Sequence, residues 1–321
     1  MPAITVNEKE TLPATQHNPH KTFWYRLSHQ KELVIMSVPL LIYVIIFSYV
    51  PLYGWLMAFQ NYKPGFSILN QEWVGFQQFK FLFTQQDFLR VLRNTIGMSV
   101  INLVLGFVTS IGFALLLNEI RNVHIKKPIQ TISYLPYFIS WVITAGIVSS
   151  SLSMDGIVNR VLVGLHIIPS PVQWLANGPA FWWILAFANI WKNLGFSAII
   201  YLGAMAGIDP ALYESAQLDG ASRWQKMRYI TLPGIKSTFV ILLIMSAANI
   251  LNAGFEPQYL LATPTNMDWS QTIDVFVMKY GINLGNYSLS VAAGMFKTVV
   301  SVILLFICNT VCAKLGEDKL I

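Results

Sequence analysis

The sequence predicts an all-α membrane protein that crosses the bilayer six times. Of its 321 residues, 55% are hydrophobic and only 11% are charged, whereas an ordinary soluble domain has about 25% charged residues. The apolar residues are gathered in stretches long enough for a membrane-spanning helix, which needs about 20 residues. Transmembrane β-strands would instead give alternating segments of about ten residues, and the sequence lacks such segments.

Six apolar stretches have the required length, and the need for internal backbone hydrogen bonds makes each of them helical. They cover residues 33–59, 95–118, 130–152, 181–208, 237–261 and 291–313. Residues 1–30 are polar and contain no apolar run, so they are not expected to be a cleavable signal peptide. We therefore expect a cytoplasmic N-terminal tail over 1–30 and a transmembrane domain over 31–321.

The Lys and Arg residues of the connections predict the orientation, because they accumulate on the cytoplasmic side. With the N-terminus inside, thirteen of them lie on the inner side: Lys9, Lys21, Arg26, Lys31, Arg121, Lys126, Lys127, Arg223, Lys226, Arg228, Lys236, Lys314 and Lys319. Six lie on the outer side: Lys63, Lys80, Arg90, Arg93, Arg160 and Lys279. Both termini are therefore expected in the cytoplasm, and the net charge of +6 requires no nucleic-acid partner.

The three outer connections, roughly 60–94, 153–180 and 262–290, are rich in aromatic residues such as Trp73 and Trp174. Aromatic rings favour the boundary between membrane and water. Partly embedded loops or short interfacial helices are one interpretation, and a face that receives a partner protein is the other. The residues alone leave both open.

The inner connection over residues 209–234 carries strong local helix signals. Asp209 is a good N-cap before a proline at the first helical position, and Gly220 can adopt the left-handed conformation that ends a helix. Ser222, followed three residues later by a glutamine, forms a capping box for a second helix. Pro233, with the glycine after it, ends that helix before the fifth span begins.

This helix–turn–helix uses about 25 residues, although a simple reversal of the chain needs only a few. Its apolar side chains stand among charges, and they are Leu212, Leu218, Trp224 and Met227. Local physics favours a docking surface for another protein. The alternative is an amphipathic helix pair that lies on the inner leaflet with the help of its basic residues.

The same loop resembles the EAA motif of ABC importer permeases. The match consists of Glu214, Ser215 and Ala216, then Gly220, then Ile230, Leu232 and Pro233, with Ser215 replacing the first alanine of the motif. Other stretches resemble the carbohydrate-uptake branch with a maltose-permease-type core: 74–79 with Asn94 and Thr95, 155–159 and 173–175. Residues 50–55 and 59–62 are more similar to oligo- and polysaccharide permeases, including alginate importers. The resemblance extends over roughly 33–315.

The resemblance implies a multi-pass permease of the bacterial cytoplasmic membrane that imports a carbohydrate, an oligo- or polysaccharide. A second, non-identical permease subunit, two ATP-binding subunits and an extracytoplasmic solute-binding protein are the implied partners. The ATPase-coupling residues implied by the motif are Glu214, Ser215, Ala216, Asp219, Gly220, Trp224, Leu232 and Pro233. Glu214 would pair with a basic residue of the ATPase, and Gly220 would set the bend. The sequence has no Gly-x-x-x-x-Gly-Lys-Ser/Thr loop, so ATP and Mg²⁺ are expected in the partner, with no enzyme activity, cofactor or metal site in this chain.

Polar residues inside spans point toward bundle interiors or aqueous paths. Two sets with spacings of three and four residues are predicted to share one helix face each and to line a translocation path for sugar hydroxyls. They are Asn189, Lys192 and Asn193 on the fourth span, and Asn249, Asn252 and Glu256 on the fifth. Hydrogen bonding between helices is the alternative role. Lys192 and Lys297 would also favour an acidic sugar polymer, since each places a cation within a span.

Three other classes of protein compete with this interpretation. One is a regulatory scaffold that only anchors an ATPase, and the polar faces of the spans argue against it. An ion-gradient-driven secondary sugar transporter would show internal repeats with interrupted spans, and the sequence shows no convincing repeat between the first three and last three spans. A membrane-embedded enzyme would need a cluster of metal ligands or nucleophiles in its spans, whereas all five histidines lie in the tail or the loops.

Overall fold

The computed structural model describes residues 30–314, apart from the side chain of Cys312. Helices dominate this part of the chain, and its strands are one short antiparallel pair, β1 (Gln60–Asn61) and β2 (Glu72–Trp73). The predicted all-α class is therefore confirmed. Of the tail predicted over 1–30, only residue 30 is among the described residues. The basic residue Lys319 lies outside them. Contacts divide the chain into two units, Met1–Gly54 and Trp55–Ile321.

The first unit contains an apolar helix that carries the predicted first span. α2 (Lys31–Val44) continues into a π-helical turn, η1 (Ile45–Tyr49), and then into a 3₁₀ helix, η2 (Val50–Phe59). Proline removes a backbone donor and disturbs the regular helical ladder, and Pro39 and Pro51 lie on either side of the π-helical turn. None of the side chains of α2 is buried, so its apolar surface is suited to lipid or to another protein.

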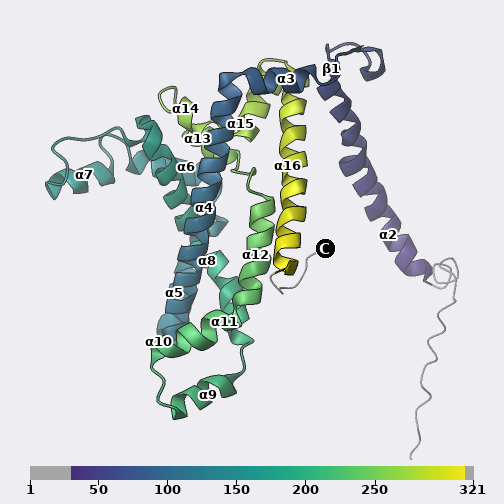
Figure 1. The fold of residues 1–321 in the computed structure, drawn as a ribbon. Helices are drawn as coiled ribbons and strands as arrows, with labels where there is room; N and C mark the ends of the chain where they lie inside the picture. The colour runs from purple at the N-terminus through teal and green to yellow at the C-terminus, as the bar shows by residue number, and fades with distance from the viewer. Residues whose placement is uncertain (1–29, 315–321) are drawn as a thin grey trace, which may run out of the picture. The chain divides into compact units, whose positions relative to one another are not determined.

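The second unit is a helical bundle in which the long helices α4 (Gln86–Glu119) and α8 (Gly178–Ala206) pack along each other (Figure 1). The remaining elements, in chain order, are η3 (Ile68–Asn70), α3 (Gln77–Thr84), α5 (Val123–Tyr134), η4 (Leu135–Phe138), α6 (Trp141–Ser151), α7 (Ile157–Gly164), η5 (Trp174–Ala176), α9 (Pro210–Leu218), α10 (Arg223–Lys226), η6 (Met227–Thr231), α11 (Leu232–Gly234), α12 (Lys236–Ala248), α13 (Glu256–Leu261), α14 (Met267–Ser270), α15 (Ile273–Met278), η7 (Lys279–Asn283) and α16 (Tyr287–Lys314).

Four helical stretches of the described chain are long and apolar enough to cross a membrane without a break. The number rises to six if each of two bent helix pairs counts as one span. In the first pair, α5 and η4 meet α6 at 101°. In the second pair, the segment Arg223–Gly234 meets α12 at 55°. The expectation of one continuous helix over 130–152 was therefore wrong, because the helix is interrupted at Ile139.

The predicted fifth span, 237–261, is also shorter than expected. α12 ends at Ala248, and irregular turns follow until α13 begins at Glu256. Gly254 has a φ of +99°, a conformation that an α-helix cannot include and that glycine adopts at little cost. The expectation that Asn249, Asn252 and Glu256 share one helix face was therefore wrong, since none of them lies within α12.

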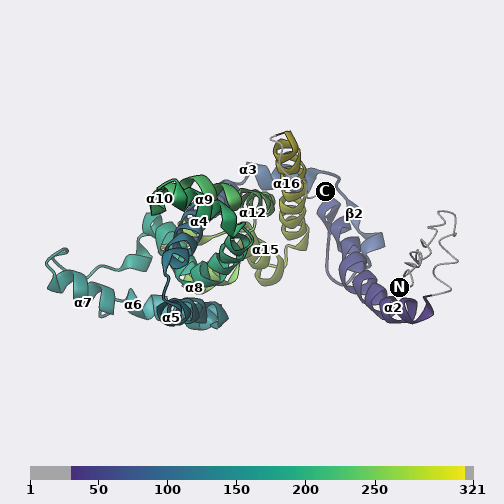
Figure 2. The ribbon, with the colours of Figure 1, turned by 90° about the horizontal axis from the view of Figure 1, so that it is seen from below.

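The end of the bundle that carries the 209–234 loop is held by a buried apolar cluster. Its members, Ala114, Ala198, Tyr201, Met205 and Ile235, come from α4, α8 and the start of α12. Short side chains such as alanine allow the helices to approach closely. α9 and α10 lie below this end of the bundle in Figure 1, and in the view from below they lie across it (Figure 2).

Candidate functional site

The loop over 209–234 folds as its local signals predict. The Asp209 side chain accepts a hydrogen bond from the Ala211 backbone at 2.9 Å, and Gly220 has a φ of +75°. Both hydrogen bonds of the capping box are present: the Ser222 backbone donates to Gln225 Oε1 at 2.7 Å, and the Gln225 backbone donates to Ser222 Oγ at 3.3 Å. The second arm ends at Gly234. The predicted helix–turn–helix is confirmed.

Hydrogen bonds between its two arms fasten the loop. The hydroxyl groups of Tyr213 and Thr231 lie 2.9 Å apart and join α9 to η6, and Thr231 is buried. Lys226 Nζ donates to Gln217 Oε1 at 3.3 Å. At the base of the loop, a Cβ at Gly234 would lie only 2.5 Å from a methyl carbon of Ile208. These contacts give the loop a defined shape on the end of the bundle.

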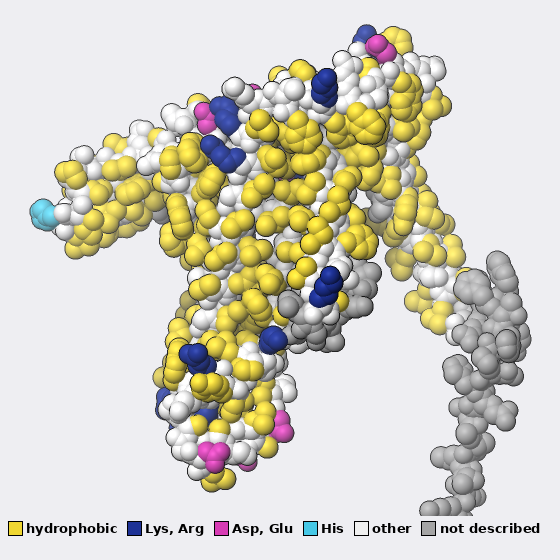
Figure 3. Space-filling model, in the orientation of Figure 1, with side chains coloured by type: hydrophobic (Ala, Val, Ile, Leu, Met, Phe, Trp, Pro, Cys, Tyr) yellow, Lys and Arg dark blue, Asp and Glu magenta, His cyan; other side chains and the backbone are white. Residues whose placement is uncertain are grey.

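The outer surface of this loop exposes large apolar side chains beside charges. Leu218 is 90% exposed, Tyr229 70% and Trp224 68%. The Glu214 carboxylate is exposed and forms no ion pair or hydrogen bond with any other residue of 30–314. Figure 3 shows charged and apolar side chains side by side on this loop, at the bottom of the view. Exposed apolar patches rimmed by polar groups are typical of protein interaction sites.

The eight predicted coupling residues all lie on this loop. Seven are exposed: Glu214, Ser215, Asp219, Gly220, Trp224, Leu232 and Pro233. Ala216 is half-buried, and its carbonyl accepts a hydrogen bond from the Ala221 backbone at 2.9 Å where α9 ends. The structure thus places the predicted residues on one accessible surface segment.

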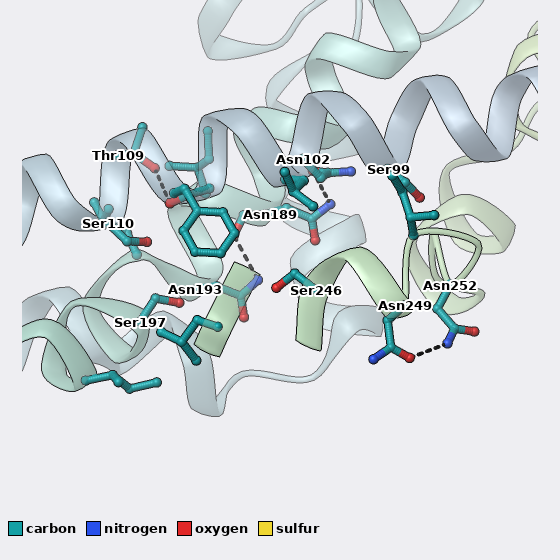
Figure 4. A pocket seen from close by; sticks show the side chains of 18 of the residues that line it. Ser99, Asn102, Thr109, Ser110, Asn189, Asn193, Ser197, Ser246, Asn249 and Asn252 are labelled. Carbon is teal, nitrogen blue, oxygen red and sulfur yellow. Dashed lines mark hydrogen bonds between the residues drawn. The ribbon is translucent and has the colours of Figure 1, made fainter. Parts of the chain in front are cut away.

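A cavity of about 450 Å³, lined by both polar and apolar side chains, lies between α4, α8, α12 and the turns that follow α12. Its polar side chains are hydroxyls and amides (Figure 4), namely Ser99, Asn102, Thr109, Ser110, Asn189, Asn193, Ser197, Tyr201, Ser246, Asn249 and Asn252. None of the described residues that line it is charged. Hydroxyl and amide groups both donate and accept hydrogen bonds, so the cavity suits a neutral, multiply hydroxylated surface.

Hydrogen bonds link the amides of the cavity to one another. Asn189 Nδ2 on α8 donates to Asn102 Oδ1 on α4 at 3.2 Å. Asn193 Nδ2 donates to the backbone carbonyl of Asn189 at 2.9 Å. Past the end of α12, Asn252 Nδ2 donates to Asn249 Oδ1 at 2.9 Å, and both side chains are exposed. The structure therefore brings four of the six predicted path residues to one cavity.

The sequence argument missed the contribution of α4. Ser99, Asn102 and Thr109 line the cavity from this helix, and their spacing of three and seven residues places them on one helix face. The same spacing test that selected the residues of the fourth span would have found them. Serine and threonine are common within apolar spans, so Ser99 and Thr109 give a weaker signal of a polar path than Asn102 does.

Lys192 and Glu256, the two charged members of the predicted path, do not line the cavity. Lys192 is buried, and its ammonium group donates to three backbone carbonyls of the α5–α6 break. Glu256 is exposed at the start of α13. Lys297 also has an internal partner, because it forms an ion pair with Asp274. Neither lysine lines the cavity, so an effect of these two charges on an acidic cargo stays a prediction.

The connections predicted to lie outside form short helices, which either of the two interpretations allows, and two asparagines hold them. Asn94 Nδ2 on α4 donates to the carbonyls of Asp268 and Gln271 at 2.9 and 3.2 Å. Asn159 Oδ1 accepts from the Val172 backbone and from Trp174 Nε1, each at 3.0 Å. These stretches, which resemble permease motifs, thus hold the outer helices in place.

Comparison with known proteins gives consistent matches over most of the chain. Residues 106–315 match the family described as "Binding-protein-dependent transport system inner membrane component". The chain is 40% identical over 299 residues to the polygalacturonan/rhamnogalacturonan transport system permease protein YteP of Bacillus subtilis (strain 168), covering 93% of this chain and 92% of YteP. It is 37% identical over 317 residues to protein LplB of the same organism, covering 98% of this chain and 99% of LplB.

Two solved structures share this fold at high coverage. One is a bacterial ABC transporter involved in the import of the acidic polysaccharide alginate, with 37% identity, a TM-score of 0.85, and coverage of 92% of this chain and 99% of that chain. The other is a bacterial alginate ABC transporter in complex with an alginate pentasaccharide-bound periplasmic protein. It is 36% identical, with a TM-score of 0.86 and coverage of 93% of this chain and 99% of that chain.

Proposed function

This chain belongs to the family of binding-protein-dependent transport system inner membrane components, and from that premise we propose that it is the permease subunit of an ATP-driven importer for an oligo- or polysaccharide. The exposed, internally fastened loop over 209–234 is the observation that carries the proposal. A permease that hydrolyses no ATP itself needs a surface through which an ATPase can move it. This loop has the shape, exposure and unpaired carboxylate that such a surface requires.

In the proposed mechanism, two ATP-binding subunits lie on the cytoplasmic side, and one of them receives this loop in a cleft. Glu214 pairs there with a basic residue, and the exposed Leu218 and Trp224 fill the apolar part of the cleft. When ATP and Mg²⁺ close the ATPase pair, the loop moves as a rigid body because its two arms are hydrogen-bonded to each other. The α11–α12 bend passes this movement to the bundle, which changes between inward-facing and outward-facing states.

A second permease subunit, a non-identical homologue, completes the channel. We place both proteins in the bacterial cytoplasmic membrane, with six crossings and both termini in the cytoplasm. A solute-binding protein delivers the sugar from outside, as the alginate transporter solved with its pentasaccharide-bound periplasmic protein suggests.

The cavity between α4, α8 and α12 is the proposed path of the sugar through this subunit. Its amides and hydroxyls can replace the water that sugar hydroxyls lose inside the membrane, so that few polar groups remain unpaired. The path residues in this proposal are Asn102, Asn189, Asn193, Asn249 and Asn252. Alginate import by the similar transporter makes an acidic oligosaccharide the first cargo to test. The uncharged lining seen here would leave recognition of its carboxylates to the partner subunits.

The test is reconstitution of the full-length chain with its partner permease and ATPase. Glu214→Ala combined with Gly220→Pro should reduce ATPase co-purification and sugar-stimulated ATP hydrolysis, while the bundle keeps its unfolding midpoint. The matched control is Asp155→Ala, which removes an exposed carboxylate from an outer connection and should change neither. Undiminished coupling in the loop variant would reject the coupling role and make an ion-gradient-driven transporter the leading alternative.

A further inference from the structure

The break in the third predicted span leaves backbone carbonyl groups that need hydrogen-bond donors. η4 ends at Phe138 and α6 begins at Trp141. The last carbonyls of a helical segment have no donor within that segment, and the hydrocarbon core supplies no water to replace one. An interruption at this depth is therefore tolerated only where another part of the protein provides the donors.

Lys192 provides them from the neighbouring helix α8. Its Nζ atom donates to the carbonyl of Tyr137 at 3.0 Å, to that of Pro136 at 3.2 Å and to that of Ile139. The side chain is only 7% exposed. An ammonium group has three donor hydrogens, one for each of these carbonyls, and the carbonyl of Pro136 also accepts from the Ile139 backbone N–H at 3.2 Å. The negative end of the helix dipole also attracts a cation at this position.

Two contacts that do not involve the ammonium bring α8 close to the break. At Gly195, a Cβ would lie 2.3 Å from the carbonyl oxygen of Ser133 on α5, so no larger residue fits without movement. Phe196 stacks on the ring of Tyr137 with 4.0 Å between ring centroids and 6° between ring planes. The lysine therefore reaches the carbonyls because the two helices are already in close contact.

The same stretch of α8 carries two amides of the cavity. Asn189 precedes Lys192 by three residues, and Asn193 follows it directly. Any shift of α8 relative to the break would move both amides and disturb the hydrogen bond between Asn189 and Asn102, which is 3.2 Å long. The attachment of Lys192 therefore acts together with the contacts of Gly195 and Phe196 on the position of the cavity wall.

We propose that Lys192 is a positioning residue that acts as a tethered cation. Its ammonium group occupies a carbonyl site at the end of a half-helix, of the kind at which some transporters bind a free ion, and it thereby fixes the amides of α8 at the cavity. The carbonyl site does not depend on the proposed function. The effect on sugar uptake rests on that function.

The test removes the tethered cation and offers a soluble one in its place. The full-length chain with its partner subunits is purified in detergent as wild type, Lys192→Ala and Lys127→Ala. The unfolding midpoint is measured with ethylammonium chloride, with sodium chloride at the same concentration, and with ethanol as a neutral molecule of similar size. Lys127 is an exposed lysine on α5 and serves as the matched control. KM for sugar uptake is measured in liposomes under the same conditions.

The Lys192→Ala variant should unfold at a lower temperature than wild type, and its KM should rise about tenfold, because the carbonyls of Tyr137 and Ile139 lose the ammonium donor and that of Pro136 keeps only the Ile139 backbone N–H. Ethylammonium should restore both values in Lys192→Ala, whereas sodium chloride and ethanol should restore neither. The control variant Lys127→Ala should keep the wild-type midpoint and KM. Wild-type stability in Lys192→Ala, or a loss that ethylammonium does not repair, would overturn the proposal. A restored midpoint with an unrestored KM would overturn the positioning of the amides.

If Lys192→Ala does not assemble, the same additions are made throughout expression and purification, and the yield of assembled complex is compared. Recovery with ethylammonium alone supports the proposal, and no recovery overturns it. A wild-type complex that is stable but takes up none of the sugars would contradict the proposed function, and it would leave the comparison of midpoints valid.

Discussion

At the scale of single residues, α8 shows why neighbouring polar side chains acquire different roles. Asn189, Lys192 and Asn193 have the spacing of one helix face, and that spacing correctly predicted two cavity residues. It failed for Lys192 because a helix face is broad, and an offset of one residue turns a side chain by about 100°. Which neighbour the lysine meets depends on the break in another helix, and the sequence of α8 contains no information about that break.

Asn189 is the residue through which the cavity can be tested most directly. Asn189→Ala removes the amide that joins α4 to α8, and Asn102 keeps its own hydrogen bond to the Met98 carbonyl at 2.9 Å. Because a net hydrogen bond is worth about 1 kcal/mol, KM for sugar uptake should rise about fivefold with ATP hydrolysis still coupled to transport. The control is Asn70→Ala, which makes the same change at an exposed residue outside the cavity. An unchanged KM in Asn189→Ala would remove this amide from the path.

At the scale of elements, the loop over 209–234 was predictable residue by residue, whereas the interruptions of the third and fifth spans were not. Caps such as Asp209 and Ser222 act within three or four residues, so the local sequence determines the structure that they stabilise. A break within an apolar span depends on donors and close contacts from other helices, such as those of Lys192 and Gly195. Hydropathy measures only whether a stretch is apolar on average, and apolar residues continue across Ile139 and, between Asn249 and Glu256, beyond Ala248.

The hydrogen bond between Tyr213 and Thr231 is expected to keep the two arms of the loop in one rigid unit. Tyr213→Phe removes the hydroxyl and keeps the ring, so the loop should remain folded. A loss of about 1 kcal/mol corresponds to about fivefold faster opening, which hydrogen exchange of the loop amides would detect. A less rigid loop should also transmit movement less completely and lower the amount of sugar imported per ATP.

Tyr229→Phe is the matched control for this prediction, because Tyr229 is an exposed tyrosine of the same loop. It should leave hydrogen exchange at the wild-type rate. Equal exchange in Tyr213→Phe and wild type would mean that the arms are held together by their packing and caps alone.

At the scale of the whole molecule, the distribution of apolar surface indicates the class of protein, whereas the distribution of charge indicates its orientation in the membrane. The second unit shows charged side chains around the 209–234 loop and around the start of α4, with apolar side chains over the length between them (Figure 3). Composition and apolar runs were enough to predict this membrane-protein class. The side of the membrane on which each end of the bundle lies is predicted only by the excess of Lys and Arg, a statistical tendency of membrane insertion. The packing of the helices gives no information about it.

The orientation can be measured by labelling single cysteines in intact cells with a maleimide that does not cross membranes. In a background with Cys308 and Cys312 replaced by alanine, Asp155→Cys should react from outside, because Asp155 is exposed on a connection predicted to face outward. Asp219→Cys, exposed on the 209–234 loop, should react only after the membrane is permeabilised. Each cysteine is the accessibility control for the other. If Asp219→Cys reacts from outside and Asp155→Cys reacts only after permeabilisation, the topology is the reverse of the predicted one, and the loop does not face the ATPase side. If both cysteines react from outside, the chain does not cross the membrane an odd number of times between 155 and 219. α8 would then not be a complete span.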